Sequence, residues 1–105
     1  MYKLIVFVPE SHTEAVKTAL FDAGAGRLGD YDSCAWQTLG TGQFRPLAGS
    51  RPFLGKQDEV ESVAEYRIEM LCAAACLKPV VAALRASHPY EEPAFELIQL
   101  VDIDV

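Results

Sequence analysis

The sequence has no apolar run long enough to cross a membrane. Its main apolar stretches are LIVFV near the start and LCAAACL in the second half. Both fall well short of the roughly 20 residues that a spanning helix requires. The opening residues MYK lead directly into a strand pattern, so we predict neither a secretory signal nor a transmembrane segment. We therefore expect a cytoplasmic protein that does not interact with membranes.

Cysteine and histidine are scarce. Cys34, Cys72 and Cys76 form no even set for a disulfide framework, and a reducing compartment keeps such thiols free. We interpret them as small core residues, although Cys72 and Cys76 would suit a soft metal if they shared a helical face. Neither histidine has an evident activated partner, so catalysis is disfavoured. The weaker alternative is an enzyme that uses Glu65 or His88 as a base.

An excess of positive charge is also absent. The formal net charge is -6 at pH 7, which argues against a protein that binds nucleic acid or an anionic membrane surface. The charge is unevenly distributed, because residues 39–57 contain three basic side chains and no acidic one. This local excess of positive charge is relevant to the kind of ligand that residues 39–57 would bind.

The length fits one compact core, and we expect a single domain over residues 1–105. Leu4–Val8 is a continuous apolar run of the kind found in a central strand. A helix is predicted from Ser11 to Ala23, with Ser11 and Glu14 spaced as a capping box at its start. The glycines that follow would supply a left-handed cap at its end.

Three further segments have clear periodicity. Strands are predicted over Tyr31–Thr38, Val60–Met70 and Phe95–Val101, the second of them with apolar even positions and charged odd positions. A second helix is predicted over Leu77–Ser87, with Pro79 tolerated in its first turn.

The order of these elements is β-α-β-β-α-β, which predicts an α+β fold of the ferredoxin-like class. Two helices would cover one face of a four-stranded antiparallel sheet and leave the other face bare. Trp36 and Cys34 are predicted to share a face of their strand, so the bare face is expected to be buried against other subunits. We therefore predict a homo-oligomer.

The stretch GAGRLG, residues 24–29, matches a dinucleotide-binding pattern letter for letter. That pattern requires a preceding strand and a following helix, so that the helix N-terminus faces a pyrophosphate. Here the glycines follow a helix and precede a strand. We interpret them as a helix cap and a turn.

A long loop without periodicity is predicted from Leu39 to Asp58, LGTGQFRPLAGSRPFLGKQD. A loop of this length inside a compact domain is either functional or a sign that an element has been misassigned. Its basic residues Arg45, Arg51 and Lys56, together with its glycines, would suit an anion such as a phosphate or a carboxylate. The alternative, which we favour, is a solvated loop or one that clasps a neighbouring subunit.

The turn HPYEEP offers a second possible site. His88, Glu91 and Glu92 supply one nitrogen and two carboxylates, a set that would bind a divalent metal such as copper or zinc. The favoured interpretation is structural, because the two prolines restrict the backbone and make a rigid connection. In that case Tyr90 packs its ring and His88 caps the preceding helix.

Two stretches carry a resemblance to a known family. GDYDSCAWQTLGTGQFRPLAGSRPFLGKQDEVESVAEYRIE and ASHPYEEPAFELI resemble the domain inserted between the two halves of NGG-interacting-factor-three-like (YqfO-type) proteins. That insert is similar to the trimeric CutA and PII signalling proteins. The resemblance implies a homotrimer with its open sheet faces turned inward. It also implies that residues 39–58 contact ligands or partners, and that His88 and Glu91 contact metal. The two-metal site of the flanking halves has no counterpart in this chain, so no hydrolase-like site is carried over.

Our leading hypothesis is a non-catalytic, homotrimeric CutA/PII-like module that binds a small ligand or a protein partner through its long loop and the clefts between subunits. The alternative is a divalent-metal-binding protein. The residues expected to bind a ligand are Arg45, Arg51, Lys56, Glu65 and Tyr90. Those expected to bind a metal are His88, Glu91 and Glu92.

Overall fold

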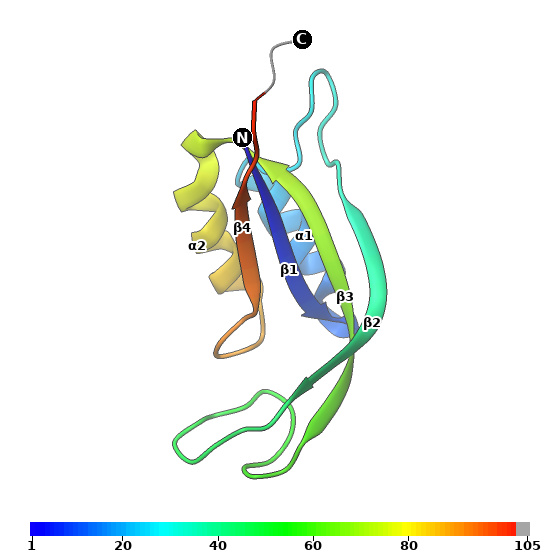
Figure 1. Cartoon of the computed structure of the whole chain (residues 1–105), viewed down its shortest axis with the longest axis vertical. Helices are drawn as coiled ribbons and strands as arrows, with labels where there is room; N and C mark the ends of the chain where they lie inside the picture. The colour runs from blue at the N-terminus through cyan, green and yellow to red at the C-terminus, as the bar shows by residue number, and fades with distance from the viewer. Residues whose placement is uncertain (103–105) are drawn as a thin grey trace.

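The computed structural model describes residues 1–102 and has the predicted α+β, ferredoxin-like architecture (Figure 1). Four strands form one sheet in the order β2-β3-β1-β4, and each strand pairs antiparallel with its neighbours. A short 3₁₀ turn precedes each helix. The elements are β1 (Tyr2–Pro9), α1 (Thr13–Asp22), β2 (Trp36–Phe44), β3 (Glu61–Cys72), α2 (Leu77–Ser87) and β4 (Phe95–Gln99).

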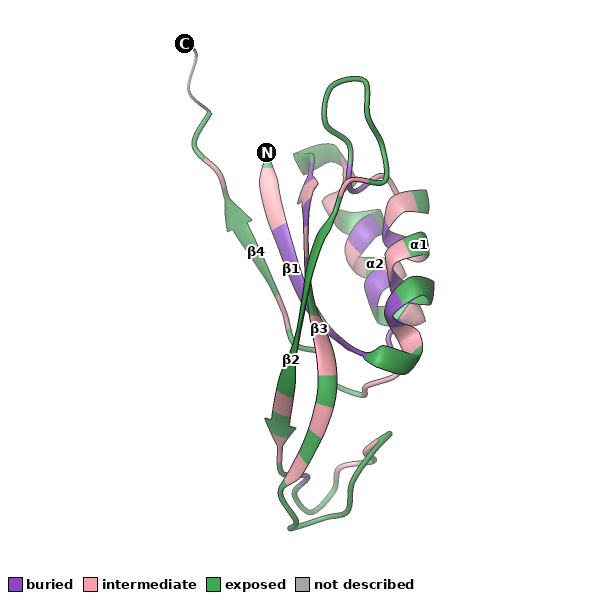
Figure 2. Ribbon diagram, turned by 90° about the vertical axis from the view of Figure 1, so that its right-hand side faces the viewer, coloured by how far each residue is buried: buried purple, intermediate pink, exposed green. Residues whose placement is uncertain are grey.

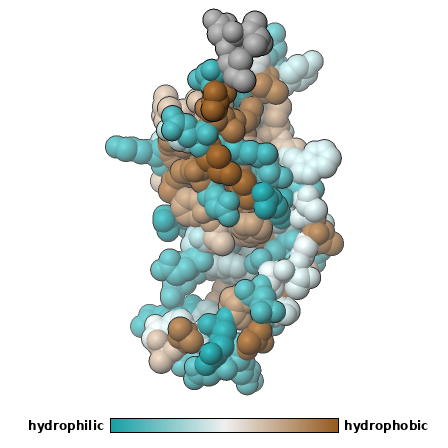
Figure 3. All heavy atoms as spheres, viewed as in Figure 1, coloured by the Kyte–Doolittle hydropathy of each residue, from teal (hydrophilic) through white to brown (hydrophobic). Residues whose placement is uncertain are grey.

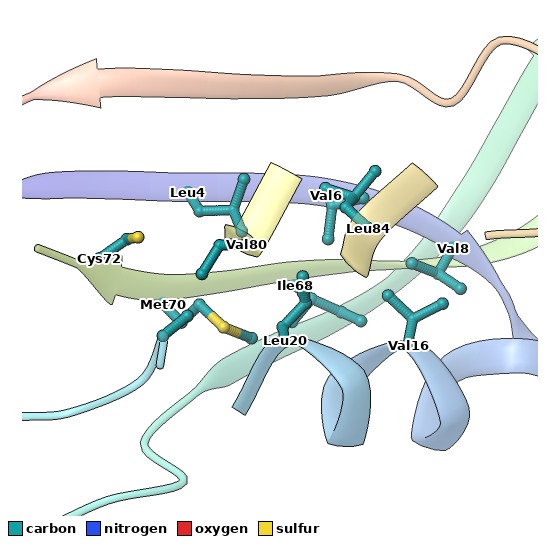
Figure 4. Close-up of a cluster of buried hydrophobic side chains, with 11 residues drawn as sticks. Leu4, Val6, Val8, Val16, Leu20, Ile68, Met70, Cys72, Val80 and Leu84 are labelled. Carbon is teal, nitrogen blue, oxygen red and sulfur yellow. The ribbon is translucent and has the colours of Figure 1, made fainter. Parts of the chain in front are cut away.

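The hydrophobic core lies between the helices and one face of the sheet (Figure 4). Alternate residues of β1 and β3 point into it, as their pairing of Leu4 with Met70 and of Val6 with Ile68 requires. Each fully buried aliphatic side chain contributes roughly 1.5–3 kcal/mol to folding. The buried residues of this cluster are Leu4, Val6, Val8, Val16, Leu20, Ala25, Ile68, Met70, Cys72, Val80 and Leu84.

Helix α1 ends as predicted but does not begin as predicted. Gly24 has a φ of 113°, and the amides of Gly24 and Ala25 donate to the carbonyls of Phe21 and Leu20, which closes the helix with a left-handed cap. This confirms the interpretation of the glycine stretch. The predicted capping box is wrong, because Ser11 lies in the 3₁₀ turn Glu10–His12 and its hydroxyl bonds the ring of His12.

The second strand and the long loop differ from the prediction. Strand β2 covers Trp36–Phe44, so the segment 31–35 is not strand and residues 39–44 are strand rather than loop. Pairing with β3 explains the difference, since each residue of β2 is matched with one from Glu61 to Glu69. The loop that joins these strands is therefore shorter, residues 45–60.

The third strand, the second helix and the last strand agree closely with the predictions. Helix α2 has the predicted bounds, and β3 is extended by two residues to Cys72. Strand β4 ends at Gln99, two residues earlier than predicted. None of the helices within residues 1–102 has the length and apolar character that a membrane crossing would require.

The sheet face opposite the helices is bare in the isolated chain (Figure 2). The pairing places Trp36, Glu69, Ile5 and Glu96 in one row across this face. Trp36 is 70% exposed. Figure 3 shows this side of the molecule, with hydrophobic atoms gathered over the upper part of the sheet and hydrophilic atoms around them. The hairpin of β2 and β3 extends beyond the two layers and gives the chain an elongated shape of 51 × 24 × 24 Å.

Candidate functional site

The loop after β2 turns back beneath the two-layered body (Figure 1). A cavity of about 270 Å³ lies beside this loop. Its walls come from β1, the end of β2, the following loop, the middle of β3 and the turn between α2 and β4. These segments are far apart in the sequence and are brought together by the antiparallel pairing of the sheet. The lining residues are Phe7, Gln43, Phe44, Arg45, Pro46, Ser50, Pro52, Phe53, Leu54, Glu65, Tyr90, Glu91, Glu92 and Ala94.

Tyr90 and Glu65 form the polar contact at the inner wall of the cavity. The hydroxyl of Tyr90 donates a hydrogen bond of 2.7 Å to Oε2 of Glu65. Desolvation raises the pKa of Tyr90, and the hydrogen bond to Glu65 raises it further. The phenol therefore stays protonated at neutral pH and acts as a hydrogen-bond donor rather than as a base.

His88 fixes the turn between α2 and β4 through two hydrogen bonds to main-chain groups. Its side chain is buried, and the residue is 6% exposed. The carbonyl of Phe7 only accepts, so the contact of 2.7 Å between them is a donation from Nε2 of His88. Its Nδ1 in turn accepts the amide of Tyr90 at 3.1 Å. Desolvation lowers the pKa of His88, more than the carbonyl of Phe7 and the charge of Glu65 raise it, so the neutral ring is favoured.

Glycine at position 42 leaves room for the Glu65 carboxylate. A Cβ atom built on Gly42 would overlap this carboxylate, whereas one built on Gly40 would meet no atom within 4 Å. Both glycines lie in β2. The glycine at position 42 thus allows Glu65 to lie flat against the neighbouring strand, where Tyr90 reaches it.

The loop is tied to the turn and to itself. The amide of Arg51 donates to Oε2 of Glu91 at 2.9 Å, which joins the loop to the turn after α2. Within the loop region, the amide of Asp58 donates to the carbonyl of Pro46 at 2.7 Å. The guanidinium of Arg45 lies 3.7 Å from the carboxylate of Asp58. These contacts fold the loop against the end of the hairpin.

The structure brings most of the predicted ligand-binding residues together. Arg45, Glu65 and Tyr90 line the cavity, and Arg51 contacts Glu91 through its main chain. Lys56 is exposed and does not line the cavity. Sequence reasoning missed the aromatic residues Phe7, Phe44 and Phe53. For Phe44 and Phe53 the only signal is the accumulation of aromatic and proline residues in residues 39–58, and Phe7, which lies in the apolar run of β1, has none.

The predicted metal residues lie close together in the chain but do not converge on one point. Both ring nitrogens of His88 are engaged by main-chain groups, and Glu91 accepts an amide. Within residues 1–102 the structure shows no group of three potential ligands placed to hold a metal ion. Metal binding by His88, Glu91 and Glu92 stays a prediction, and it requires His88 to give up one of its two bonds.

Cys72 and Cys76 are free thiols. Cys72 is buried in the core, where desolvation and the neighbouring Cys76 raise its pKa. A raised pKa favours the thiol over the thiolate that a soft metal requires.

Comparison with known proteins gives both a sequence relationship and a fold. No protein-family model matches the chain. The chain is 48% identical over 99 residues to a Mycobacterium tuberculosis protein named GTP cyclohydrolase 1 type 2 homolog, and 44% identical over 95 residues to a Bacillus subtilis protein of the same name. These matches cover 94% and 90% of the chain but 26% of each relative. The chain thus spans about a quarter of the length of the curated relatives it matches.

Two solved structures extend the comparison. A Bacillus cereus protein related to NIF3 is 40% identical, with a TM-score of 0.83, over 96% of this chain and 26% of that one. The PII-like protein CutA from Nostoc superimposes with a TM-score of 0.67 at 17% identity, over 95% of this chain and 81% of that one. At this identity the second likeness shows the fold alone.

Proposed function

The chain is homologous to one part of the NIF3-related proteins and has the CutA/PII-like fold, and we propose that it is a non-catalytic, homotrimeric binding module. In this proposal it binds a small ligand or a protein partner through the loop after β2 and through the clefts between subunits. The observation that carries the proposal is the cavity beside Glu65 and Tyr90, which the loop and the turn after α2 form together.

The bare sheet face supports self-association. Trp36 is exposed at the edge of this face, and Ile98 of β4 is 45% exposed on the same face. Exposed apolar side chains on a sheet face that no helix covers are typical of surfaces that contact another chain. Contact with identical subunits would remove them from water.

The state of the two histidines supports a binding role rather than catalysis. His88 uses both ring nitrogens to hold the main chain. The ring of His12 lies edge-on to Phe53 at 5.4 Å between centroids, and its Nδ1 contacts the hydroxyl of Ser11. Among the residues that the structure describes, neither ring is paired with both a nucleophile and a second orienting group.

Light scattering coupled to size exclusion tests the assembly. At micromolar concentration we expect three times the chain mass of 11.5 kDa. A strict monomer would overturn the trimer and, with it, the clefts between subunits.

An NMR screen with a fragment library of mixed charge tests the binding role. Bound fragments are expected to shift the amide signals of Phe44, Arg51 and Tyr90 more than those of α1 or α2. Fragments that bind only elsewhere would contradict a role for the cavity. Turnover in a panel of hydrolase and phosphatase substrates would contradict the non-catalytic assignment.

A further inference from the structure

The residues that line the cavity indicate the charge of its ligand, which the composition of the loop alone does not. Aromatic rings form much of its wall. Phe44 comes from the end of β2, Phe53 from the loop, and Tyr90 from the turn after α2. The ring centroids of Phe44 and Phe53 lie 5.8 Å and 6.3 Å from that of Tyr90. Three rings from three segments are thus gathered around one small space.

The central ring of this group is held in place. The hydroxyl of Tyr90 is fixed by Glu65, and its ring packs against the buried His88 at 4.9 Å between centroids. The planes of Phe44 and Phe53 are tilted by 57° and 47° to the plane of Tyr90, so neither ring stacks flat on it, and all three rings line the same cavity. An aromatic ring attracts a cation that lies over its face within about 6 Å of its centroid, and rings that line one cavity can act on the same cation.

The charged residues of the cavity have the sign that complements a cation. Glu65, Glu91 and Glu92 line it with a single basic residue, Arg45, which gives a formal charge of -2. Arg45 is also paired with Asp58, outside the lining. The basic residues of the loop therefore do not make the cavity positive, although the sequence had suggested an anion.

The same chain already pairs cations with aromatic rings on its surface. The guanidinium of Arg67 lies 5.7 Å from the ring centroid of Phe7, and that of Arg85 lies 5.3 Å from the ring of Phe95. Among Phe44, Phe53 and Tyr90, by contrast, no such pairing is found within residues 1–102. These three rings can therefore meet a cation that the ligand brings.

We propose that the cavity binds a small organic cation, with an ammonium or guanidinium group placed among Phe44, Phe53 and Tyr90 and its charge balanced by the glutamates of the lining. The inference rests on the proposed binding function and specifies its ligand class. The volume of about 270 Å³ fits a ligand with a short chain.

Choline and its neutral isostere 3,3-dimethyl-1-butanol test the charge requirement, because they differ in one atom and in charge but hardly in shape. Binding is measured by NMR titration of the intact protein at low salt. We expect choline to bind at least tenfold more tightly than the isostere and to shift the signals of Phe44, Phe53 and Tyr90. Equal or tighter binding of the isostere overturns the cation inference while leaving a ligand-binding cavity.

Two variants and two matched controls test the site. Phe53→Leu removes a ring and Glu92→Gln removes a charge from the lining, and each is expected to weaken choline binding by threefold or more. Tyr31→Leu and Glu14→Gln make the same changes outside the cavity, the second of them on α1, and are expected to have no effect. Inorganic phosphate is titrated for comparison, as a ligand of the opposite charge to choline. Binding of phosphate but not choline at the cavity, or no binding of choline at all, overturns the inference.

Discussion

Tyr90 and Glu65 join the turn after α2 to the middle of β3 by one hydrogen bond of 2.7 Å. They are 25 residues apart in the chain, and the bond connects the body of the protein to its projecting hairpin. The bond is partly buried, and a hydrogen bond shielded from water is electrostatically stronger than one in solvent. Its geometry depends on the absence of a side chain at position 42.

The two glycines of β2 are expected to respond differently to the same substitution. In Gly42→Ala the new methyl group displaces the Glu65 carboxylate, and loss of its bond to Tyr90 lowers the free energy of unfolding by about 1 kcal/mol. Gly40→Ala meets no atom and should be neutral or slightly stabilising, because alanine restricts the unfolded chain. Urea unfolding measures both.

Tyr90→Phe provides the control for this mechanism. If Gly42→Ala acts by breaking the bond between Glu65 and Tyr90, the two substitutions combined should cost less than the sum of their separate effects. Additive effects, or equal effects of Gly42→Ala and Gly40→Ala, would show that the methyl group acts in another way.

His88 is expected to matter for stability far more than the other histidine. His88→Ala leaves the carbonyl of Phe7 and the amide of Tyr90 without their partner, and each buried group left unpaired costs about 1–3 kcal/mol. His12→Ala loses an edge contact with Phe53 and should cost less than about 1 kcal/mol. Similar unfolding midpoints for the two variants would count against the role assigned to His88.

The lowered pKa of His88 predicts how stability changes with pH. The unfolded chain takes up the proton near its ordinary pKa of about 6.5, whereas the folded chain takes it up at lower pH. Stability should therefore fall as the pH drops below about 6.5, by at most about 1.4 kcal/mol per pH unit, and should recover fully above it. In His88→Gln this part of the pH dependence should disappear from urea unfolding curves recorded between pH 4.5 and 8. An unchanged curve would contradict the assignment.

Metal titration separates the binding module from the alternative function. Both ring nitrogens of His88 are engaged, so we expect copper and zinc to bind wild type and His88→Gln with the same affinity. Calorimetry at pH 7 measures this directly. A loss of tenfold or more in the variant would instead support a metal site in the turn of His88, Glu91 and Glu92.

A charge on the bare sheet face should disrupt the assembly. Trp36→Glu places a carboxylate beside Glu69, its partner across the sheet, and between subunits this costs several kcal/mol. We expect dissociation or aggregation in light scattering. Gln37→Glu is the matched control, because Gln37 bonds Lys17 of α1 on the other face of the sheet. An unchanged oligomer in Trp36→Glu would mean that this face does not form the interface.

Much of the fold could be predicted because its core elements have strong periodicity. Strand β1 is apolar from Leu4 to Val8, and α2 repeats Val80 and Leu84 on one face, so their positions follow from local sequence. Strand β2 could not be predicted in full. Its glycines and polar residues indicate a loop, and only the ladder with β3 makes them strand. Ser11 and Glu14 have the spacing of a capping box, and local sequence does not reveal that Ser11 lies in a 3₁₀ turn ahead of the helix.

The candidate site could be predicted only in part. Glu65 and Tyr90 were expected at a ligand site, but nothing in one dimension brings Phe44 and Phe53 to the ring of Tyr90. Their meeting depends on the hairpin extending past the helices and on the loop folding back. The charge of the cavity is the hardest property to predict, because the sequence shows three basic residues in one segment, Arg45, Arg51 and Lys56, whereas the folded chain lines the cavity with three glutamates.

The projecting hairpin has a consequence for dynamics. None of the nine residues of β2 is buried, so its ladder with β3 is held mainly by backbone bonds. Such a segment opens at a lower free energy than β1, and its amides exchange with deuterium first. A ligand in the cavity that contacts both the projecting hairpin and the body of the protein would slow this exchange. Ligand binding would thus be detected as slower deuterium exchange of the amides of β2, while the exchange of the core amides would not change.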